Sequence, residues 1–262
     1  MADRGELSRS FGAAADVYEA GRPDYPSAAV DWLLAPARSE DGTVRVADVG
    51  AGTGKLSRVA LALGADVVAI DPDAGMLAVL QGAVPGVPTA IGTAEDLPLP
   101  SSSVDAVLLG QAWHWVEPVA GSREIARVLR PGGVLGLVWN VRDHREPWVR
   151  RLTGVMRGSH AEEMMAAGDP PVAAPFEGLA RREWRWSRPM TRAAVTDMVR
   201  SRSYVITASA EERARIEAGV ADLLDEVGAV GYAVVELPYV TTAFRAVRPA
   251  PPPEPGPGAP RP

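Results

Sequence analysis

The stretch Val46-Ala47-Asp48-Val49-Gly50-Ala51-Gly52-Thr53-Gly54-Lys55 decides the fold. A short apolar run leads into three glycines at alternate positions, and a segment with helical spacing of its apolar residues follows. This order predicts a buried strand over 44–49, a tight turn, and a helix over 54–63. Because glycine tolerates positive φ and lets a ligand approach the backbone, we interpret the turn as a binding loop.

A second apolar run, over 67–71, ends in the carboxylate of Asp71. A carboxylate at the tip of the second strand is where the two hydroxyls of a ribose are held in nucleoside-binding sheets. Its two acceptor oxygens match the two donors of a cis-diol. The alternative role is a helix cap for the segment 73–82, which Asp73 can already provide. The pattern therefore favours a nucleoside-type cofactor at the carboxyl ends of parallel strands.

Strands and helices continue to alternate along the chain, which predicts an α/β fold with a doubly wound, mostly parallel sheet. The further strands are expected at 87–91, 104–109, 134–139, 183–186 and 239–247. The further helices are expected at 123–130, 192–203 and 210–227, with a turn at Pro131-Gly132-Gly133 after the first of them.

Two more segments complete a recognisable set, namely Gly92-Thr93-Ala94-Glu95-Asp96-Leu97-Pro98 and Val128-Leu129-Arg130-Pro131-Gly132-Gly133. With these and the glycine turn, roughly residues 40–140 resemble the class I S-adenosylmethionine-dependent methyltransferases, in particular the small-molecule group called type 11. The resemblance implies a Rossmann-like sheet of seven strands, whose sixth and seventh strands form an antiparallel hairpin at its edge. It also implies S-adenosylmethionine as the cofactor.

The resemblance assigns the cofactor's methionine portion to the glycine turn. The backbone amides expected to face it belong to Gly50, Ala51, Gly52 and Gly54. Asp48 would help to hold the cofactor's amino group, or alternatively would only order the loop. Gln111, directly after the strand 104–109, would reach the same amino-acid portion.

The adenosine portion is assigned to three other segments. Asp71 would bind the ribose, and Pro72 and Met76 would contact the adenine face, although Met76 is equally suited to the core. The adenine edge would be contacted by Thr93, Ala94 and Glu95. The family commonly has aspartate at position 93, and Thr93 is a weaker acceptor, so Ala94 and Glu95 are expected to take over part of its role.

The run Gln111-Ala112-Trp113-His114-Trp115 resembles the corresponding segment of the trans-aconitate methyltransferase-like group, whose acceptors are small acids. His114 is the candidate catalytic base, since it is the one titratable base in the run; the alternative is a structural imidazole. Trp113 and Trp115 are expected to wall the acceptor pocket or to stack on the cationic sulfonium, unless they belong to the core.

An N-terminal pattern Tyr18-x-x-x-Arg22-Pro-x-Tyr25-Pro occurs in the same group, where the segment folds over the cofactor. Tyr18, Arg22 and Tyr25 are therefore candidate substrate-binding residues. Arg22 would pair with a carboxylate, either the cofactor's own or the substrate's. The alternative is a packed helix and turn that carries a surface arginine.

Composition excludes several functions. The net charge of −6 argues against non-specific nucleic-acid binding, and the absence of cysteine excludes disulfides and thiolate sites. His144 and His160 lack metal-ligand spacing, so no metal is expected. No apolar run approaches the ~20 residues that span a bilayer, and residues 1–10 lack a signal-peptide core. We expect a cytoplasmic monomer or homodimer that acts on a small-molecule acceptor, with no membrane or nucleic-acid partner.

The expected organisation is an N-terminal helical cap (1–40), a methyltransferase domain (41–248) with an inserted lid region (141–180), and a disordered proline-rich tail (249–262). Two other functions stay open. An NAD(P)-dependent oxidoreductase would need glycine where Lys55 stands and a Tyr-x-x-x-Lys pair. A non-catalytic module that binds S-adenosylmethionine would keep the glycine turn and Asp71 without turnover.

Overall fold

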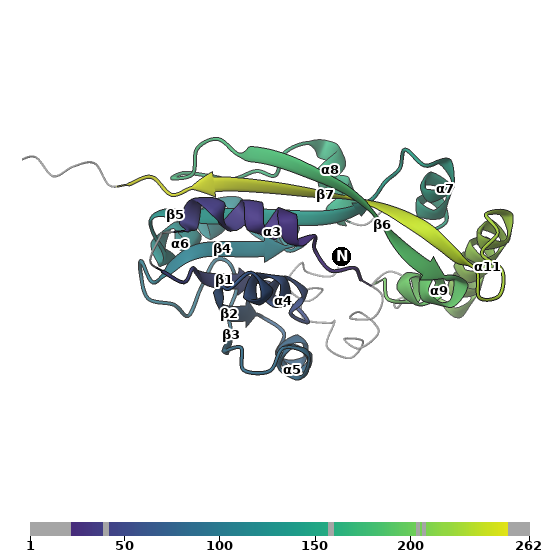
Figure 1. Ribbon diagram of the computed structural model, residues 1–262, viewed down its shortest axis with the longest axis horizontal. Coiled ribbons are helices and arrows are strands. Elements are labelled where there is room, and N and C mark those ends of the chain that lie inside the picture. The colour runs from purple at the N-terminus through teal and green to yellow at the C-terminus, as the bar shows by residue number, and fades with distance from the viewer. Residues whose placement is uncertain (1–21, 39–41, 157–159, 203–204, 206–207, 251–262) are drawn as a thin grey trace, which may run out of the picture.

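The computed structural model describes residues 22–38, 42–156, 160–202, 205 and 208–250. Its centre is a seven-stranded sheet in the order β3-β2-β1-β4-β5-β7-β6 (Figure 1). The strands are β1 Arg45–Val49, β2 Asp66–Asp71, β3 Thr89–Ile91, β4 Val104–Gly110, β5 Leu129–Arg142, β6 Ala180–Thr191 and β7 Val234–Val247. The pairs among β1 to β5 are parallel, and β7 is antiparallel to both β5 and β6. The predicted doubly wound fold and its antiparallel edge are confirmed.

Helices cover both faces of this sheet. Their bounds are α3 Ser27–Leu34, η2 Ala35–Ala37, α4 Lys55–Ala62, α5 Ala74–Ala83, η3 Trp113–Trp115, α6 Pro118–Val128, α7 Pro147–Met156, α8 His160–Ala167, α9 Arg192–Arg200 and α11 Ala210–Glu226. Apolar side chains of α3, α4 and α5 form one core with the sheet, and those of α6 form a second core on the opposite face. The alternation of buried side chains along the strands supplies both cores.

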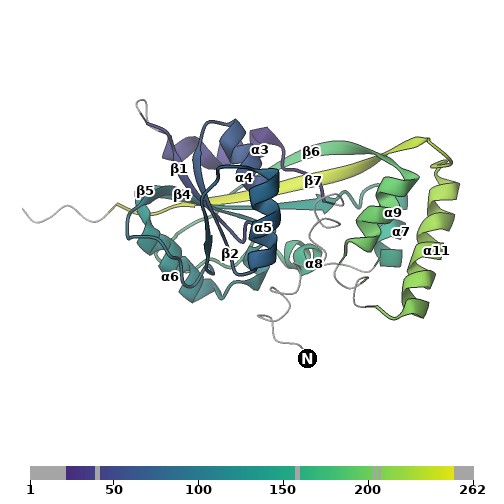
Figure 2. The same ribbon diagram turned by 90° about the horizontal axis from the view of Figure 1, so that it is seen from below.

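A third core lies beyond the sheet. The far ends of β6 and β7 extend past the parallel strands and pack against α7, α9 and α11 (Figures 1 and 2). We call these three helices with the ends of β6 and β7 the accessory unit. Strands of this length were not predicted, because the polar and aromatic residues of β6 mark a strand only where they alternate clearly. The expected strand over 183–186 is thus the middle of a strand that runs from Ala180 to Thr191.

Pro131-Gly132-Gly133 does not form the predicted turn between a helix and a strand, because this segment lies within β5. It forms an irregularity there: Leu129 pairs with Val104 and Val134 with Ala106, so β5 gains extra residues between the two pairs. Gly132 has a φ of +80°, which suits such a bulge. Helix α6 also begins earlier than expected, because the Glu117 carboxylate caps it by accepting from the amides of Val119 and Ala120.

The expected lid region, 141–180, contains α7 and α8. Helix α7 contributes to the third core, and α8 packs against β5 and η3. A covering role for this region stays a prediction. Of the expected cap and tail, only 22–38 and 249–250 are described, and the first part of the cap, residues 1–21, lies outside the described residues. Across the described residues, no helix combines the length and the apolarity that a membrane crossing requires.

Candidate functional site

The glycine turn connects β1 to α4 and has the backbone that its sequence predicts. Gly50, Gly52 and Gly54 have φ values of +68°, +55° and +87°. A Cβ on Gly50 would lie 2.6 Å from the Cβ of Ala112, and one on Gly54 would lie 2.8 Å from Leu80 Cγ. Gly52 differs, since a Cβ there would meet no heavy atom within 4 Å. Close packing therefore explains two of the glycines, whereas Gly52 borders open space that a ligand can approach.

Asp71 ends β2 beside this turn and is only 7% exposed. Its Oδ2 accepts a hydrogen bond of 2.8 Å from the amide of Gly52, and its Oδ1 accepts one of 2.9 Å from the amide of Asp73. Burial raises the pKa of this carboxyl above its ordinary value. The helix cap is indeed Asp73, which accepts from the amides of Gly75 and Met76. Asp71 is thus oriented by the backbone and keeps acceptor capacity on both oxygens.

Asp48 lies at the end of β1 and is 1% exposed. Its Oδ2 accepts a 2.6 Å hydrogen bond from the hydroxyl of Ser57, while its buried Oδ1 accepts none from the residues that the structure describes. Desolvation raises the pKa of this carboxyl to about 7. A buried oxygen without a donor is costly, and an ammonium group of a ligand would satisfy it. The Asp48 environment fits a cofactor that carries an amino group.

The segment expected at the adenine edge forms a tight turn. The amides and carbonyls of Thr93 and Asp96 exchange two hydrogen bonds of 3.2 Å, and Ala94 is 4% exposed. The Glu95 carboxylate accepts a 2.8 Å hydrogen bond from the amide of Glu117, so this side chain anchors the start of α6. Met76 is buried on α5, a position that also fits the core interpretation.

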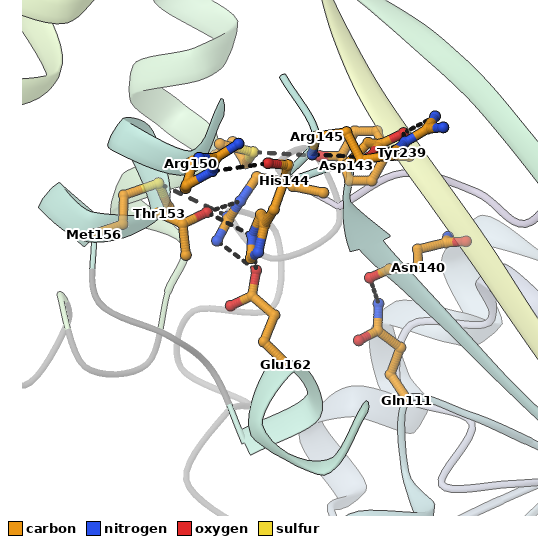
Figure 3. A network of polar contacts seen from close by, with 12 residues as sticks. Gln111, Asn140, Asp143, His144, Arg145, Arg150, Thr153, Met156, Glu162 and Tyr239 are labelled. Atoms are coloured by element: carbon orange, nitrogen blue, oxygen red, sulfur yellow. Dashed lines mark hydrogen bonds and ion pairs between the residues drawn. The ribbon is translucent and has the colours of Figure 1, made fainter. Parts of the chain in front are cut away.

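Gln111 follows β4 and is one of two described non-glycine residues with positive φ, at +54°. Its amide donates to the carbonyl of Val138 at 2.8 Å, and its side-chain Nε2 donates to the carbonyl of Asn140 at 3.2 Å (Figure 3). A strained backbone at the carboxyl end of a central strand is typical of a functional position. It directs the Gln111 side chain across the boundary between β4 and β5.

Asn140 is a site residue that sequence reasoning missed. Its Nδ2 donates to the carbonyl of Asp24 at 3.2 Å, and its Oδ1 accepts from the hydroxyl of Thr241 at 2.6 Å. The Trp186 indole N–H donates in turn to Thr241 Oγ1 at 2.8 Å. Asn140 therefore joins the segment before α3 to β5, β6 and β7. The signal available in the sequence was a polar amide directly after the apolar run that ends at Trp139.

The three residues of η3 occupy different environments. Trp113 is 1% exposed, packs within the α6-side core, and donates its indole N–H to the carbonyl of Pro171 at 2.8 Å. His114 and Trp115 are partly buried, and their ring centroids lie 4.9 Å apart. This burial favours the core alternative for Trp113. Catalysis by His114 and a pocket role for Trp115 stay predictions.

The N-terminal segment reaches the same end of the sheet. Tyr25 packs over the end of β4, because a Cβ on Gly110 would lie 2.6 Å from the Tyr25 hydroxyl oxygen. Asp24 pairs with Arg58 at 2.6 Å and with Lys55 at 3.5 Å, which fixes the segment to α4. Tyr18 lies outside the described residues. The structure thus places Tyr25 at the end of β4, against the residue that precedes Gln111, and the covering role of this segment stays a prediction.

No group of three or more potential metal ligands among His, Cys, Asp and Glu lies together in the described parts of the chain. The geometry leaves one concentration of features: the glycine turn, two buried carboxylates, the strained Gln111, and the segment around Tyr25. All of them lie at the carboxyl ends of β1, β2 and β4, where open α/β sheets bind their ligands.

Comparisons with known proteins agree with this geometry. A family profile described as a methyltransferase domain matches residues 47–137. An uncharacterized methyltransferase of Mycobacterium tuberculosis, Rv3342, is 46% identical over 249 residues, which cover 93% of this chain and 97% of the relative. A malonyl-[acyl-carrier protein] O-methyltransferase of Methylococcus capsulatus is 38% identical over 133 residues, 48% of each chain.

A solved structure has the same fold. It is a proposed type II methyltransferase from Anaeromyxobacter dehalogenans, which is 25% identical and superposes with a TM-score of 0.69. The match covers 87% of this chain and 99% of the other. Because the match covers more than the segment of the family profile, the similarity includes regions on both sides of residues 47–137.

Proposed function

Because the chain belongs to the S-adenosylmethionine-dependent methyltransferases, we propose that it transfers the cofactor's methyl group to an oxygen of a small acceptor molecule, either a carboxylate or a hydroxyl. The observation that carries the proposal is the arrangement at the end of β1 and β2. The turn after β1 contains an open glycine position, Gly52. The strand ends that flank this turn contribute the oriented carboxylate of Asp71 and the buried acceptor oxygen of Asp48.

The residues fit the bound cofactor group by group. Asp71 would accept from the ribose hydroxyls, and Asp48 Oδ1 would accept from the amino group, which removes the cost of its unsatisfied burial. Gln111 is positioned to contact the amino-acid portion from the end of β4. The bound cofactor supplies an electrophilic methyl group on a sulfonium. The task left to the chain is to exclude water and to align the acceptor oxygen with that carbon.

Two features support oxygen as the acceptor atom. The similar chain from Methylococcus capsulatus is an O-methyltransferase that acts on a malonyl group. The run that contains His114 lies at the end of β4, where a base would take the proton of a hydroxyl acceptor. A carboxylate acceptor is already ionised at neutral pH and would need alignment alone.

Calorimetric titration of the full chain tests the cofactor site. S-adenosylmethionine and S-adenosylhomocysteine are titrated into the wild type and into Asp71→Ala, with NADH as the control ligand. We expect micromolar binding of both sulfur nucleosides by the wild type, a strong loss of affinity in Asp71→Ala, and no binding of NADH. Binding of NADH in place of the sulfur nucleosides would favour an oxidoreductase, and unchanged affinity in Asp71→Ala would remove that residue from the site.

A methyl-transfer assay tests the acceptor. Release of S-adenosylhomocysteine is measured with small carboxylic acids and with the alcohols of matched carbon skeleton. Turnover with the acids whose rate is insensitive to His114→Gln would identify a carboxylate acceptor. Turnover with the alcohols that collapses in His114→Gln would identify a hydroxyl acceptor and a base. Methylation confined to amines or thiols would contradict the proposed oxygen acceptor.

A further inference from the structure

Three arginines from separate elements meet where the sheet gives way to the accessory unit. Arg22 precedes α3, Arg142 ends β5, and Arg202 follows α9. Arg142 is 3% exposed, and the Nε atom of Arg202 is buried. Burial lowers the pKa of the Arg202 guanidinium, the positive charges of Arg22 and Arg142 act in the same direction, and the resulting pKa is about 9. The junction therefore concentrates positive charge in a place that water reaches poorly.

Glu162 of α8 supplies countercharge at this junction. Arg142 donates from Nη2 to Glu162 of α8 at 2.7 Å and from Nε to Thr153 of α7 at 3.1 Å. The negative charge of Glu162 also acts on Arg202. The buried Nε of Arg202 donates no hydrogen bond to any described residue. A buried guanidinium nitrogen without an acceptor is unfavourable, so the surroundings of this Nε fit a site that is completed by an anion.

The remaining groups hold Arg142 in place. Thr153 is hydrogen-bonded to the His144 ring at 3.0 Å, and Figure 3 shows Glu162 pointing from α8 toward His144 and Thr153. Tyr239, which pairs with Arg142 across β5 and β7, is 2% exposed and stacks on Trp186. Arg142 is thus fixed by neighbours on three elements, whereas the Nε–H of Arg202 has no acceptor among the described residues.

The junction is next to the proposed transfer site. Asn140 and Arg142 are two residues apart on β5, so their side chains lie on the same face of the sheet. Asn140 also accepts the hydrogen bond from Gln111 through its carbonyl. An anion held by Arg142 and Arg202 would therefore lie on the accessory-unit side of the end of β4 and β5. Both arginines are outside the residues that match the family profile, 47–137.

We propose that Arg202 and Arg142 bind an anionic group of the acceptor molecule, a carboxylate or a phosphate, and hold its reactive oxygen at the end of β4. This inference rests on the proposed methyl transfer. It deepens that function by naming the class of acceptor. The guanidinium fork suits both anions, because each offers two oxygens to parallel N–H donors. Arg202 is the specificity-determining residue, since its buried Nε–H has no other acceptor in the described structure.

Anion-dependent thermal stability of the full chain tests the subsite without knowledge of the acceptor. Melting is recorded in chloride, glutarate and phosphate at equal ionic strength, for the wild type, Arg202→Gln, Arg202→Lys and Arg215→Gln. Arg215 is the matched control, because its side chain is 73% exposed on α11. Phosphate stabilises many proteins non-specifically, so the deciding quantity is the difference between the wild type and Arg202→Gln.

We expect glutarate or phosphate to raise the wild-type Tm over its value in chloride by about 3 °C more than in Arg202→Gln. Arg215→Gln should respond like the wild type, and Arg202→Lys, which keeps charge without the fork, should respond less than the wild type. The better of the two anions identifies the head group. An equal response of the wild type and Arg202→Gln to both anions would overturn the proposal, as would an equal loss in Arg215→Gln.

Titration with S-adenosylhomocysteine separates this inference from the proposed function. Affinity should stay within about two-fold in Arg202→Gln, because the arginine binds the acceptor. A parallel loss of nucleoside and anion binding would assign Arg202 to the cofactor's own carboxylate and overturn the proposal. If the wild type bound no S-adenosylhomocysteine but kept the anion-specific shift, the methyl-transfer function would fail while the anion subsite stood.

Discussion

The side chain of Gln111 donates a hydrogen bond to the backbone carbonyl of Asn140, and it does so from a left-handed backbone with a φ of +54°. The same Asn140 binds the carbonyl of Asp24 and the hydroxyl of Thr241. One strained residue at the end of β4 therefore connects to the end of β5, to the N-terminal segment and to β7. Two substitutions of Gln111 therefore distinguish the effect of the backbone strain on stability from the effect of the side chain on ligand binding.

Replacement of Gln111 by glycine should leave the free energy of unfolding close to that of the wild type. The variant loses a hydrogen bond, worth about 1 kcal/mol, but it relieves a positive-φ strain of similar size. Gln111→Ala keeps the strain and should be less stable by about 1 kcal/mol. Urea denaturation measures both values. Affinity for S-adenosylhomocysteine should fall about ten-fold in both variants, consistent with one lost polar contact; wild-type affinity in either would exclude Gln111 from the cofactor site.

Gly50 should be the least replaceable glycine of the turn. Alanine at 50 places its Cβ 2.6 Å from that of Ala112 in a left-handed backbone, so Gly50→Ala should cost about 2–3 kcal/mol of stability. Gly52→Ala meets open space and should cost about 1 kcal/mol from its backbone alone. The double variant Gly50→Ala with Ala112→Gly removes the clash, and its destabilisation should fall below the sum of the single effects. Strict additivity would show that Ala112 is not what restricts position 50.

Trp113 should behave as a core residue. Its side chain is 1% exposed and its indole N–H is bound to the Pro171 carbonyl, so Trp113→Ala should cost about 3–5 kcal/mol in chemical denaturation. Trp113→Phe restores part of the volume without the donor and should lie in between. Trp115→Phe is the matched variant at a partly exposed position and should cost less than 1 kcal/mol, in the range typical of surface sites. Loss of turnover in Trp113→Phe at full stability would restore the predicted pocket role.

The sequence was sufficient for the parts of the site that depend on local patterns. The glycine turn, Asp48 and Asp71 stand at strand ends that hydrophobic runs mark, and the positive φ values follow from the glycines themselves. Asp73 was likewise recognised as a cap, because a cap acts within two or three residues of its own position.

Residues whose role depends on distant partners were not predictable. Asn140 binds groups that are 116 and 101 positions away in the sequence. The electrostatic environment of Arg202 depends on the charges of Arg22 and Arg142. The length of β6 and β7 has the same origin, because their outer halves are stabilised by packing on α9 and α11. Neither periodicity nor composition encodes which elements the third core will bring together.

Asp48 should make the stability of the ligand-free protein depend on pH. Its folded pKa of about 7 lies above the ordinary value of 3.8, so the folded protein binds the extra proton. The stabilisation from this group is complete below about pH 4 and is lost as the pH rises through about 7, with a total of about 4 kcal/mol as an upper bound. Asp48→Asn, which keeps the shape without the titration, should flatten this part of the curve. Urea denaturation between pH 5 and pH 8 at constant ionic strength provides the measurement; equal slopes in the two proteins would contradict the assignment.

The same carboxyl should couple cofactor affinity to pH in the opposite direction. An amino group on Asp48 Oδ1 would favour the ionised acid, so affinity for S-adenosylhomocysteine should rise with pH up to the folded pKa of about 7 and level off above it. The slope below pH 7 should approach ten-fold per pH unit, the limit for one released proton. Asp48→Asn should bind more weakly at pH 8 and lose this slope, while the exposed control Arg215→Gln should keep both. A slope that survives in Asp48→Asn would assign the proton to another group and leave Asp48 with the role of ordering the loop through Ser57.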